Sequence, residues 1–271
     1  MSVPMIVCGA AGRMGRTLVQ LIAASDQATL VGAVEAPGNG TVGSDAGVVA
    51  GAGVLGVAIT DDYDAIAAPG NVTLDFTGAE AALEHLATAA KRGAAIVIGS
   101  TGFDAAQQHE LGILAPKTRT VIAPNMSVGI AVLQRLIREA ATALPDFDPE
   151  IVEIHHRMKV DAPSGTALAL ARTVAEASGR TLENDAVYGR SGVVGKRQSN
   201  EVGVMALRGG DIVGDHTVIF AGLGERLELT HRAQSRDCLA RGAIRAGIWL
   251  AGQKPGRYGM ADVLGWSGAR A

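Results

Sequence analysis

The amino-acid sequence predicts an α/β protein, in which a Rossmann-like, parallel-sheet dinucleotide-binding domain is joined to an α+β domain with a mixed open sheet. The chain of 271 residues is 48% hydrophobic and contains 36 glycines, but only 3% of its residues are aromatic, which is typical of aliphatic strands joined by tight turns. Short apolar runs alternate with amphipathic segments in the first half, a pattern that indicates repeated β-α units. Three strand-like runs in the second half indicate a mixed or antiparallel sheet.

Net charge, hydropathy and cysteine spacing limit the classes of protein that this sequence fits. The formal net charge is −3, and charged residues are scattered instead of forming runs, so we expect neither nucleic acid nor a membrane as a partner. The N-terminus lacks a basic leader, and no apolar run approaches the length of a membrane span, about 18 residues, so we expect a cytoplasmic protein. Cys8 and Cys238 lack the spacing of a disulfide framework or a zinc site.

A glycine-rich turn follows the first predicted strand, over residues 5–9, and opens a predicted helix. Its glycines are Gly9, Gly12 and Gly15, a G-x-x-G-x-x-G pattern in place of the commoner G-x-G-x-x-G. A second strand ends at Glu35, 20 residues after Gly15, near the spacing at which an acidic side chain meets the ribose hydroxyls of a dinucleotide. Strand, turn, helix and acid together favour a dinucleotide site over glycines that merely permit close packing.

After a long excursion over residues 36–58, regular alternation predicts a helix over 60–70, a strand over 71–77, a helix over 79–93 and strands over 94–102 and 120–127. Parallel sheets bind ligands at the carboxyl ends of their strands. The turns after the last two strands are therefore candidate cofactor loops. Their residues are Gly99, Ser100, Thr101, Ala123, Pro124, Asn125 and Met126.

An amphipathic helix over residues 127–144, with Val128, Val132, Leu136 and Ala140 on one stripe, leads out of this domain. We expect residues 1–127 and 237–271 to form the dinucleotide-binding domain and residues 128–236 to form the substrate-binding and tetramerisation domain. Within the second domain, the polar, glycine-rich stretch that ends at Asn200 predicts a long loop. Strands over 201–208, 216–222 and 226–233 and a long final helix follow.

The stretch from Glu153 to Ala167, EIHHRMKVDAPSGTA, concentrates acid/base side chains before a helix start. Ser164 stands where an N-cap belongs, so the helix is expected to begin at Gly165. The first N–H groups of that helix favour a carboxylate or phosphate. His155, His156 and Lys159 lie just upstream, and imidazole is suited to proton transfer near neutral pH. The segment therefore predicts a catalytic site for an anionic substrate.

This segment, with HH, then K, then DAPSGTA, resembles the signature of the 4-hydroxy-tetrahydrodipicolinate reductase family, and the resemblance extends over essentially the whole chain. The resemblance implies NAD(P)H-dependent reduction of 4-hydroxy-tetrahydrodipicolinate, a cyclic dicarboxylate, to tetrahydrodipicolinate in lysine and diaminopimelate biosynthesis. It also implies a homotetramer assembled through the second sheet. The roles implied are proton donor/acceptor for His155, proton donor for Lys159, and substrate carboxylate binding for His156, Gly165 and Thr166.

The resemblance assigns both candidate loops to the nicotinamide end of the cofactor, and it places the rest of the cofactor on Gly9, Ala10, Ala11, Gly12, Arg13, Met14 and Glu35. The family often has arginine after the acidic position, where it can pair with a 2′-phosphate, but this chain has Ala36. A phosphate beside Glu35 without a guanidinium is repelled. We therefore expect NADH to be preferred and NADPH to remain possible, with partial compensation from Arg13 or Arg16.

Two other classes of protein, and a metal site, fit the sequence less well. A non-catalytic NADH-binding sensor would keep the glycine turn and Glu35 but would not need His155 and Lys159. A semialdehyde dehydrogenase that works through a thioester needs a positioned cysteine, and neither cysteine qualifies. A metal site is not expected, because its candidate ligands lack i, i+4 helical spacing and a carboxylate or thiolate cluster; these ligands are His155, His156, His216 and His231.

Overall fold

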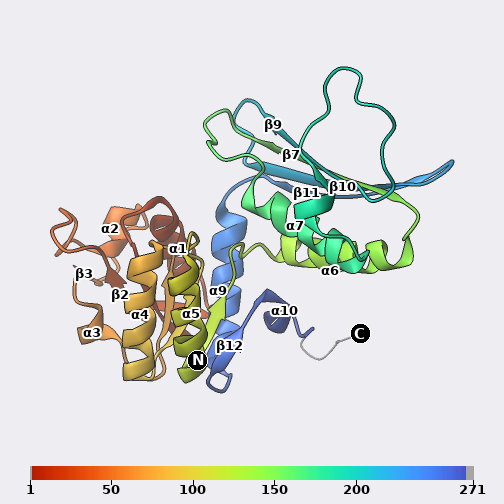
Figure 1. The fold of residues 1–271 in the computed structure, drawn as a ribbon. Coiled ribbons are helices and arrows are strands. Elements are labelled where there is room, and N and C mark those ends of the chain that lie inside the picture. The colour runs from red at the N-terminus through yellow and green to blue at the C-terminus, as the bar shows by residue number, and fades with distance from the viewer. Residues whose placement is uncertain (1, 267–271) are drawn as a thin grey trace. The chain divides into compact units, whose positions relative to one another are not determined.

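The computed structural model describes residues 2–266. The chain divides into two compact units, Met1–Ser127 with Asp237–Ala271, here called the first unit, and Val128–Arg236, called the second unit. Each unit has its own sheet with helices packed on it (Figure 1). The fold class predicted from the sequence is confirmed, because the first sheet is entirely parallel and the second is mixed.

The seven-stranded sheet of the first unit places β1 at its switch point. Its spatial order is β12 (Gly256–Tyr258), β6 (Arg119–Ile122), β5 (Ala95–Ile98), β4 (Val72–Asp75), β1 (Val3–Cys8), β2 (Ala28–Val34) and β3 (Ile59–Thr60). The chain moves from β1 to β2 and β3 on one side, and then to β4, β5 and β6 on the other. This is the doubly wound order whose ligands bind at the carboxyl ends of the strands near the switch.

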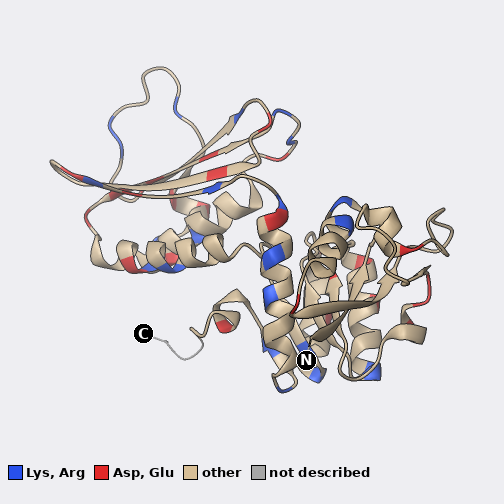
Figure 2. Ribbon diagram, turned by 180° about the vertical axis from the view of Figure 1, so that it is seen from behind, with Lys and Arg blue, Asp and Glu red and all other residues tan. Residues whose placement is uncertain are grey.

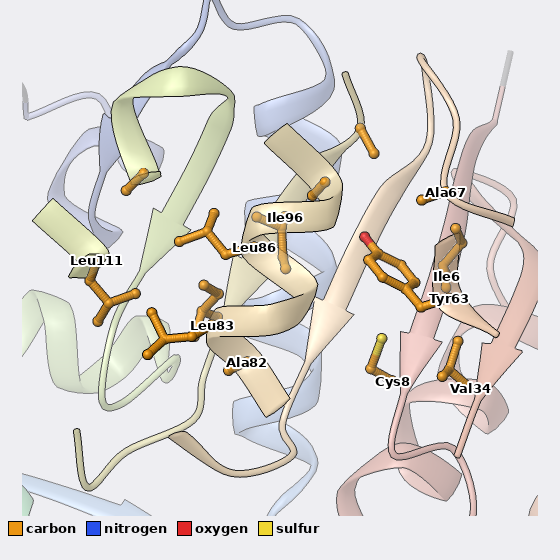
Figure 3. Packing of buried hydrophobic residues seen from close by; sticks show 14 residues of the cluster. Ile6, Cys8, Val34, Tyr63, Ala67, Ala82, Leu83, Leu86, Ile96 and Leu111 are labelled. Atoms are coloured by element: carbon orange, nitrogen blue, oxygen red, sulfur yellow. The ribbon is translucent and has the colours of Figure 1, made fainter. Parts of the chain in front are cut away.

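Helices cover both faces of this sheet. They are α1 (Arg13–Ala23), α2 (Ala46–Ala50), α3 (Tyr63–Ile66), α4 (Ala79–Arg92), α5 (Ala105–Leu114), the 3-10 turn η1 (Ala115–Lys117), α9 (Asp237–Ala251) and α10 (Met260–Val263). Ile6 and Cys8 of β1 pack in the core with α4, as Figure 3 shows. Met5 points to the opposite face, where Gly247 of α9 approaches it. Strands buried on both faces explain the continuous apolar runs in the sequence.

The second unit contains a five-stranded sheet with two helices on one face (Figure 1). The strand order is β11 (Arg226–Ala233), β10 (Gly214–Ala221), β7 (Asp148–His155), β9 (Val202–Arg208) and β8 (Ala186–Val187). Strand β10 runs antiparallel to both β7 and β11, whereas β7 and β9 are parallel. The helices are α6 (Val128–Ala143), α7 (Gly165–Ala177) and the short α8 (Leu182–Asp185).

The stripe predicted for α6 is wrong. Val132 and Leu136 are 38% and 48% exposed, whereas Ile130, Leu133 and Ile137 are buried against the sheet. Both sets have helical spacing, so periodicity alone could not decide which apolar face of α6 the sheet covers.

Acidic and basic residues are interspersed over both units, as Figure 2 shows.

The long loop between β8 and β9 is tied to β7 by charge pairs. Arg190 donates to Glu150 Oε2 at 3.0 Å, and Arg197 donates to Glu150 Oε1 at 3.0 Å and to Asp148 at 2.6 Å. Among the helices of residues 2–266, none has the length and apolar character that crossing a bilayer requires.

Candidate active site

The helix start predicted at Gly165 is confirmed. Ser164 is the N-cap of α7, and its Oγ accepts a hydrogen bond from the N–H of Ala167 at 3.1 Å. Ser164 itself is buried, but Gly165 is exposed and Thr166 is half-buried. No atom lies within 4 Å of the position that a side chain would take at Gly165. The first turn of α7 is therefore open to an anion.

His155 ends β7, and its imidazole is held by a neighbouring carboxylate. Its Nδ1 lies 2.5 Å from Oε2 of Glu153, and Glu153 is completely buried. Arg208 reaches the same carboxylate from β9 with two bonds, to Oε2 at 2.9 Å and to Oε1 at 3.0 Å. Burial favours the neutral acid, but the hydrogen bonds from Arg208, His155 and the Ser164 N–H outweigh it and keep the pKa of Glu153 below its usual value.

Lys159 lies in the loop between β7 and α7 and is paired with Asp161. Its ammonium donates to Oδ1 and Oδ2 of Asp161 at 2.7 and 2.9 Å. The hydrogen bond from Lys159 lowers the pKa of Asp161, so this carboxylate is ionised at neutral pH. In the same unit, Arg236 brings a further cation to within 3.4 Å of Nε2 of His156. Arg236 therefore places positive charge beside His156.

His216 joins the site from β10. Its Nε2 lies 3.2 Å from Oγ of Ser164, and its ring meets the ring of His155 edge-on at 5.2 Å between centroids. Burial, followed by the nearby His155, lowers the pKa of His216 to about 4, so its ring is neutral at pH 7. A neutral, buried imidazole supports the packing of His155 without adding charge.

In the glycine turn of the first unit, two backbone segments lie in close contact. Gly9 has φ 72°, and a Cβ on Gly15 would lie 2.0 Å from the carbonyl oxygen of Gly9, so both positions require glycine. Helix α1 begins after Gly12 without a side-chain cap. Glu35, which follows β2, reaches back to accept the N–H of Ala11 at 2.7 Å. The turn and the acid predicted together are thus adjacent.

Two further loops, after β5 and β6, begin at the same edge of this sheet, where the parallel strands have their carboxyl ends. Ser100 after β5 donates from Oγ to Asp75 Oδ1 at 3.0 Å, and Asn125 after β6 accepts the N–H of Ser127 at 2.9 Å. Asp75 ends β4, the neighbour of β1 in the sheet. Its carboxylate also accepts from Thr77, whose methyl carbon would contact a Cβ on Gly9 at 3.2 Å. Asp75 and Thr77 were not singled out from the sequence, although their place after β4 follows from the predicted strand order.

The structure separates the predicted site residues into two groups. The second unit contains the end of β7, the loop that follows it and the first turn of α7, which carry His155, His156, Lys159, Gly165 and Thr166. The first unit carries the predicted cofactor residues after β1, β2, β5 and β6, namely Gly9, Ala10, Ala11, Gly12, Arg13, Met14, Glu35, Gly99, Ser100, Thr101, Ala123, Pro124, Asn125 and Met126.

The side chains that could share a metal ion and the two cysteines all lie in the first unit. Within residues 2–266, the one grouping whose ligand atoms could share an ion is Cys8, Asp75 and His85, with those atoms within 4.8 Å of one another. Burial, reinforced by Asp75, raises the pKa of the Cys8 thiol, and burial also raises the pKa of Cys238. Neither cysteine is therefore a ready thiolate for a thioester mechanism.

A doubly wound parallel sheet with a glycine turn after β1 and an acidic side chain after β2 is typical of proteins that bind a dinucleotide. Two family profiles show which class of pyridine-nucleotide-dependent oxidoreductase the chain belongs to. The N-terminal profile of dihydrodipicolinate reductase matches residues 3–126, and the C-terminal profile matches residues 129–264. The chain belongs to the dihydrodipicolinate reductase family.

Individual relatives agree with this assignment. The chain is 49% identical to the 4-hydroxy-tetrahydrodipicolinate reductase of Pelobacter propionicus over 96% of its length and 97% of the relative's. It is 51% identical to the enzyme of the same name from Thiobacillus denitrificans, over 98% and 99% of the two chains. A dipicolinate-bound dihydrodipicolinate reductase from Paenisporosarcina sp. TG-14 has the same fold, with a TM-score of 0.76, 23% identity and coverage of 97% and 99%.

Proposed function

We propose that this chain reduces 4-hydroxy-tetrahydrodipicolinate to tetrahydrodipicolinate with NAD(P)H, as a cytoplasmic enzyme of lysine and diaminopimelate biosynthesis. One observation carries the proposal: a single buried carboxylate, Glu153, bonds both the imidazole of His155 and the backbone N–H of Ser164, at the start of α7. A proton-transfer group and an anion site are thereby held together, as a carboxylated substrate requires. The family assignment supplies the identity of that substrate.

The residues of the first unit suit a pyridine dinucleotide. Gly9, Gly12 and Gly15 allow a phosphate group to approach the N-terminus of α1, where a larger side chain at Gly15 would strike the Gly9 carbonyl. Glu35 lies beside this turn with a carboxylate able to accept ribose hydroxyls. We assign the nicotinamide end to the loops after β5 and β6. The bound reduced nicotinamide supplies the hydride of the reaction.

The second unit would supply the rest of the chemistry. Loss of water from the 4-hydroxy substrate leaves an unsaturated ring; the ring then takes up one hydride and one proton, so NAD(P)H and H⁺ are consumed and NAD(P)⁺ and water are released. We assign the proton to His155, with Lys159 as a second proton donor and as a cation that stabilises negative charge developing on the ring. His156, Gly165 and Thr166 bind the substrate carboxylates.

We propose that NADH is preferred over NADPH. The carboxylate of Glu35 accepts the backbone N–H groups of Ala11 and Ala36 at 2.7 and 3.3 Å, so its negative charge lies where a 2′-phosphate would approach. Ala36 offers no cation there. Arg16 donates from Nε to the carbonyl of Ala11 at 2.8 Å, which keeps its guanidinium near the turn and supports residual use of NADPH.

We also propose a homotetramer built through the second sheet. Strand β11 is an edge strand without a fully buried residue, and Leu223 and Leu227 are exposed on or beside it. An uncovered edge with apolar side chains is a surface that natural proteins usually cover.

Oxidation of NADH on addition of the product of the preceding synthase reaction tests the reductase function. We expect loss of the reduced-nicotinamide absorbance in proportion to the substrate added, together with formation of tetrahydrodipicolinate. A purified, folded protein that binds NADH but leaves it unoxidised would end the reductase proposal and favour a binding module.

A further inference from the structure

Glu153 lies at a core-facing position of β7, where an apolar side chain is expected. Alternate residues of β7 are buried, and Ile151, two residues earlier on the same face, lies in the hydrophobic core. A lone carboxylate there would be costly. Glu153 is nevertheless fully buried and ionised, with its pKa held below the usual value although burial opposes this. The hydrogen bonds that Glu153 accepts therefore stabilise its negative charge enough to offset the cost of burial.

Both oxygens of Glu153 make two hydrogen bonds each. Oε2 faces Nδ1 of His155 at 2.5 Å and accepts from Arg208 at 2.9 Å. Oε1 accepts from the N–H of Ser164 and from Arg208, each at 3.0 Å. Arg208 also donates to the carbonyl of Asp161 at 2.6 Å, in the loop that carries Lys159. One carboxylate thus joins β7, β9 and the start of α7.

These contacts determine which ring nitrogen of His155 carries the proton. An ionised carboxylate only accepts hydrogen bonds, so Nδ1 of His155 must carry a proton and donate it to Glu153. The other nitrogen, Nε2, is then the one that exchanges a proton. A Cβ at Gly214 of β10 would lie 2.8 Å from Nε2, so only glycine at that position leaves room for the ring. Carboxylates orient imidazoles in this way in other proton-transfer sites.

We propose that Glu153 is the positioning residue of the active site: it fixes the Nδ1–H tautomer of His155 and holds that imidazole at a set place relative to the anion-binding start of α7. The proposal rests on the proposed role of His155 in proton transfer. Arg208 is the counter-ion that allows the carboxylate to stay charged within the core.

Glu153→Gln tests this with almost no change of shape. The backbone N–H of Ser164 can only donate, so it pins the amide oxygen and turns the amide NH₂ toward His155. Nδ1 must then accept, and the proton moves to Nε2. We expect kcat to fall by on the order of 10², with the KM for NADH changed less than about threefold, because the cofactor residues lie in the first unit.

The matched control is Glu150→Gln. Glu150 lies three residues earlier on β7 and is likewise paired with guanidinium groups, those of Arg190 and Arg197. Its contacts hold the loop over residues 188–201 and no histidine. We expect its kcat to remain within about twofold of the wild type. Because Glu153→Gln leaves Arg208 without its counter-ion, the double variant Glu153→Gln/Arg208→Leu is made in parallel. It removes the buried charge, and we expect it to fold while keeping the loss of kcat.

Nitrogen-15 NMR of the His155 ring reads the tautomer directly. We expect the proton on Nδ1 in the wild type and in Glu150→Gln, and on Nε2 in Glu153→Gln. An unchanged tautomer, or a kcat equal to that of the Glu150→Gln control in a folded Glu153 variant, would overturn the proposal. The NMR comparison needs no turnover. If the wild type fails to oxidise NADH, the reductase function is lost, yet the spectra still decide whether Glu153 fixes His155.

Discussion

Asp75 in the first unit and Glu153 in the second each bury a carboxylate against Nδ1 of a histidine, at 2.6 Å from His85 and 2.5 Å from His155. Their remaining partners differ. Among the described residues, the other hydrogen-bond donors to Asp75 are neutral groups of Thr77 and Ser100, whereas Glu153 is paired with a guanidinium.

This difference indicates different tasks for two similar pairs. Glu153 keeps the counter-ion Arg208 whether or not His155 holds a second proton, so proton exchange at His155 leaves the buried carboxylate neutralised. Among the described residues, Asp75 has only His85 as a partner that can carry positive charge, and it fastens the loops after β4 and β5. We therefore expect proton transfer at the histidine whose carboxylate has its own counter-ion, and not at the other.

The largest expected effect separates the two histidines. His155→Gln should lower kcat by on the order of 10² or more, because general acid/base steps contribute about 10² to 10⁴, with little change in NADH affinity. His85→Gln, made as the matched variant, should leave kcat within about tenfold when NADH is saturating. Steady-state kinetics on both variants measures this. Equal losses of kcat would remove the distinction between the pairs.

Lys159→Ala should also lower kcat by on the order of 10². The ammonium of Lys159 is the cation assigned to the developing charge, and Asp161 is its partner. Lys196→Ala, in the loop over residues 188–201, is the control for loss of a positive charge in the same unit. Near-normal turnover of Lys159→Ala would withdraw the catalytic role of that residue.

The neutral ring of His216 predicts a pH-dependent stability. Its pKa is lowered from 6.5 to about 4 in the folded protein, so the unfolded chain binds a proton at His216 below pH 6.5 and the folded chain does not until about pH 4. The stability contributed is fully present above the unfolded value and is lost as pH falls toward the folded value, by about 3 kcal/mol in total.

Denaturant unfolding at pH 7 and at about pH 4.5 measures this loss. We expect a smaller decrease for His216→Gln than for the wild type, and an unchanged decrease for His109→Gln, whose histidine is exposed. If His216→Gln and the wild type lose the same stability, folding does not lower the pKa of His216.

The proposed preference for NADH rests on Glu35 and Ala36 of the first unit. An arginine–phosphate contact contributes roughly 1.5 to 3 kcal/mol, or about ten to a hundredfold in affinity. Ala36→Arg should therefore raise kcat/KM for NADPH much more than for NADH. The ratio of the two values in wild type and variant is the measurement. A wild-type preference for NADPH, or an equal response of both cofactors, contradicts the proposed role of Glu35 and Ala36.

The smallest expected effect concerns the anion site of the second unit. Pyridine-2,6-dicarboxylate should inhibit competitively with substrate, and Thr166→Val should weaken its binding by about 1 to 3 kcal/mol if the hydroxyl donates to a carboxylate. Thr166→Ser is the control, because it keeps the hydroxyl. An inhibition constant unchanged in Thr166→Val would show that backbone groups alone bind the anion.

Local signals made the site partly predictable from the sequence. Ser164 as a cap and Gly165 as the start of α7 follow from a few adjacent residues. The strand order follows from the alternation of elements. Glu153 is different, because Arg208 lies 55 residues away and the N–H of Ser164 lies 11 residues away, so no local pattern indicates their meeting. The one available signal was a glutamate at a core-facing position of a strand.

Other misses have similar physical causes. The three-residue strand β12 is too short to show a period of two, and it joins β6 only through a parallel pairing between distant segments. Helix α6 has two apolar faces, and only the packing of the sheet selects the one with Ile130 and Ile137. Where tertiary contacts choose between equivalent local patterns, the sequence alone cannot.

One titration tests most directly whether the Glu153–His155 pair, and not the Asp75–His85 pair, serves the substrate. The chain has 6 histidines, whose ring nitrogens can be assigned by single substitutions and followed by nitrogen-15 NMR. With NADH present, adding pyridine-2,6-dicarboxylate should shift the signals of His155 and His156 and leave that of His85 in place. A shift of His85 with His155 and His156 unmoved would contradict the account.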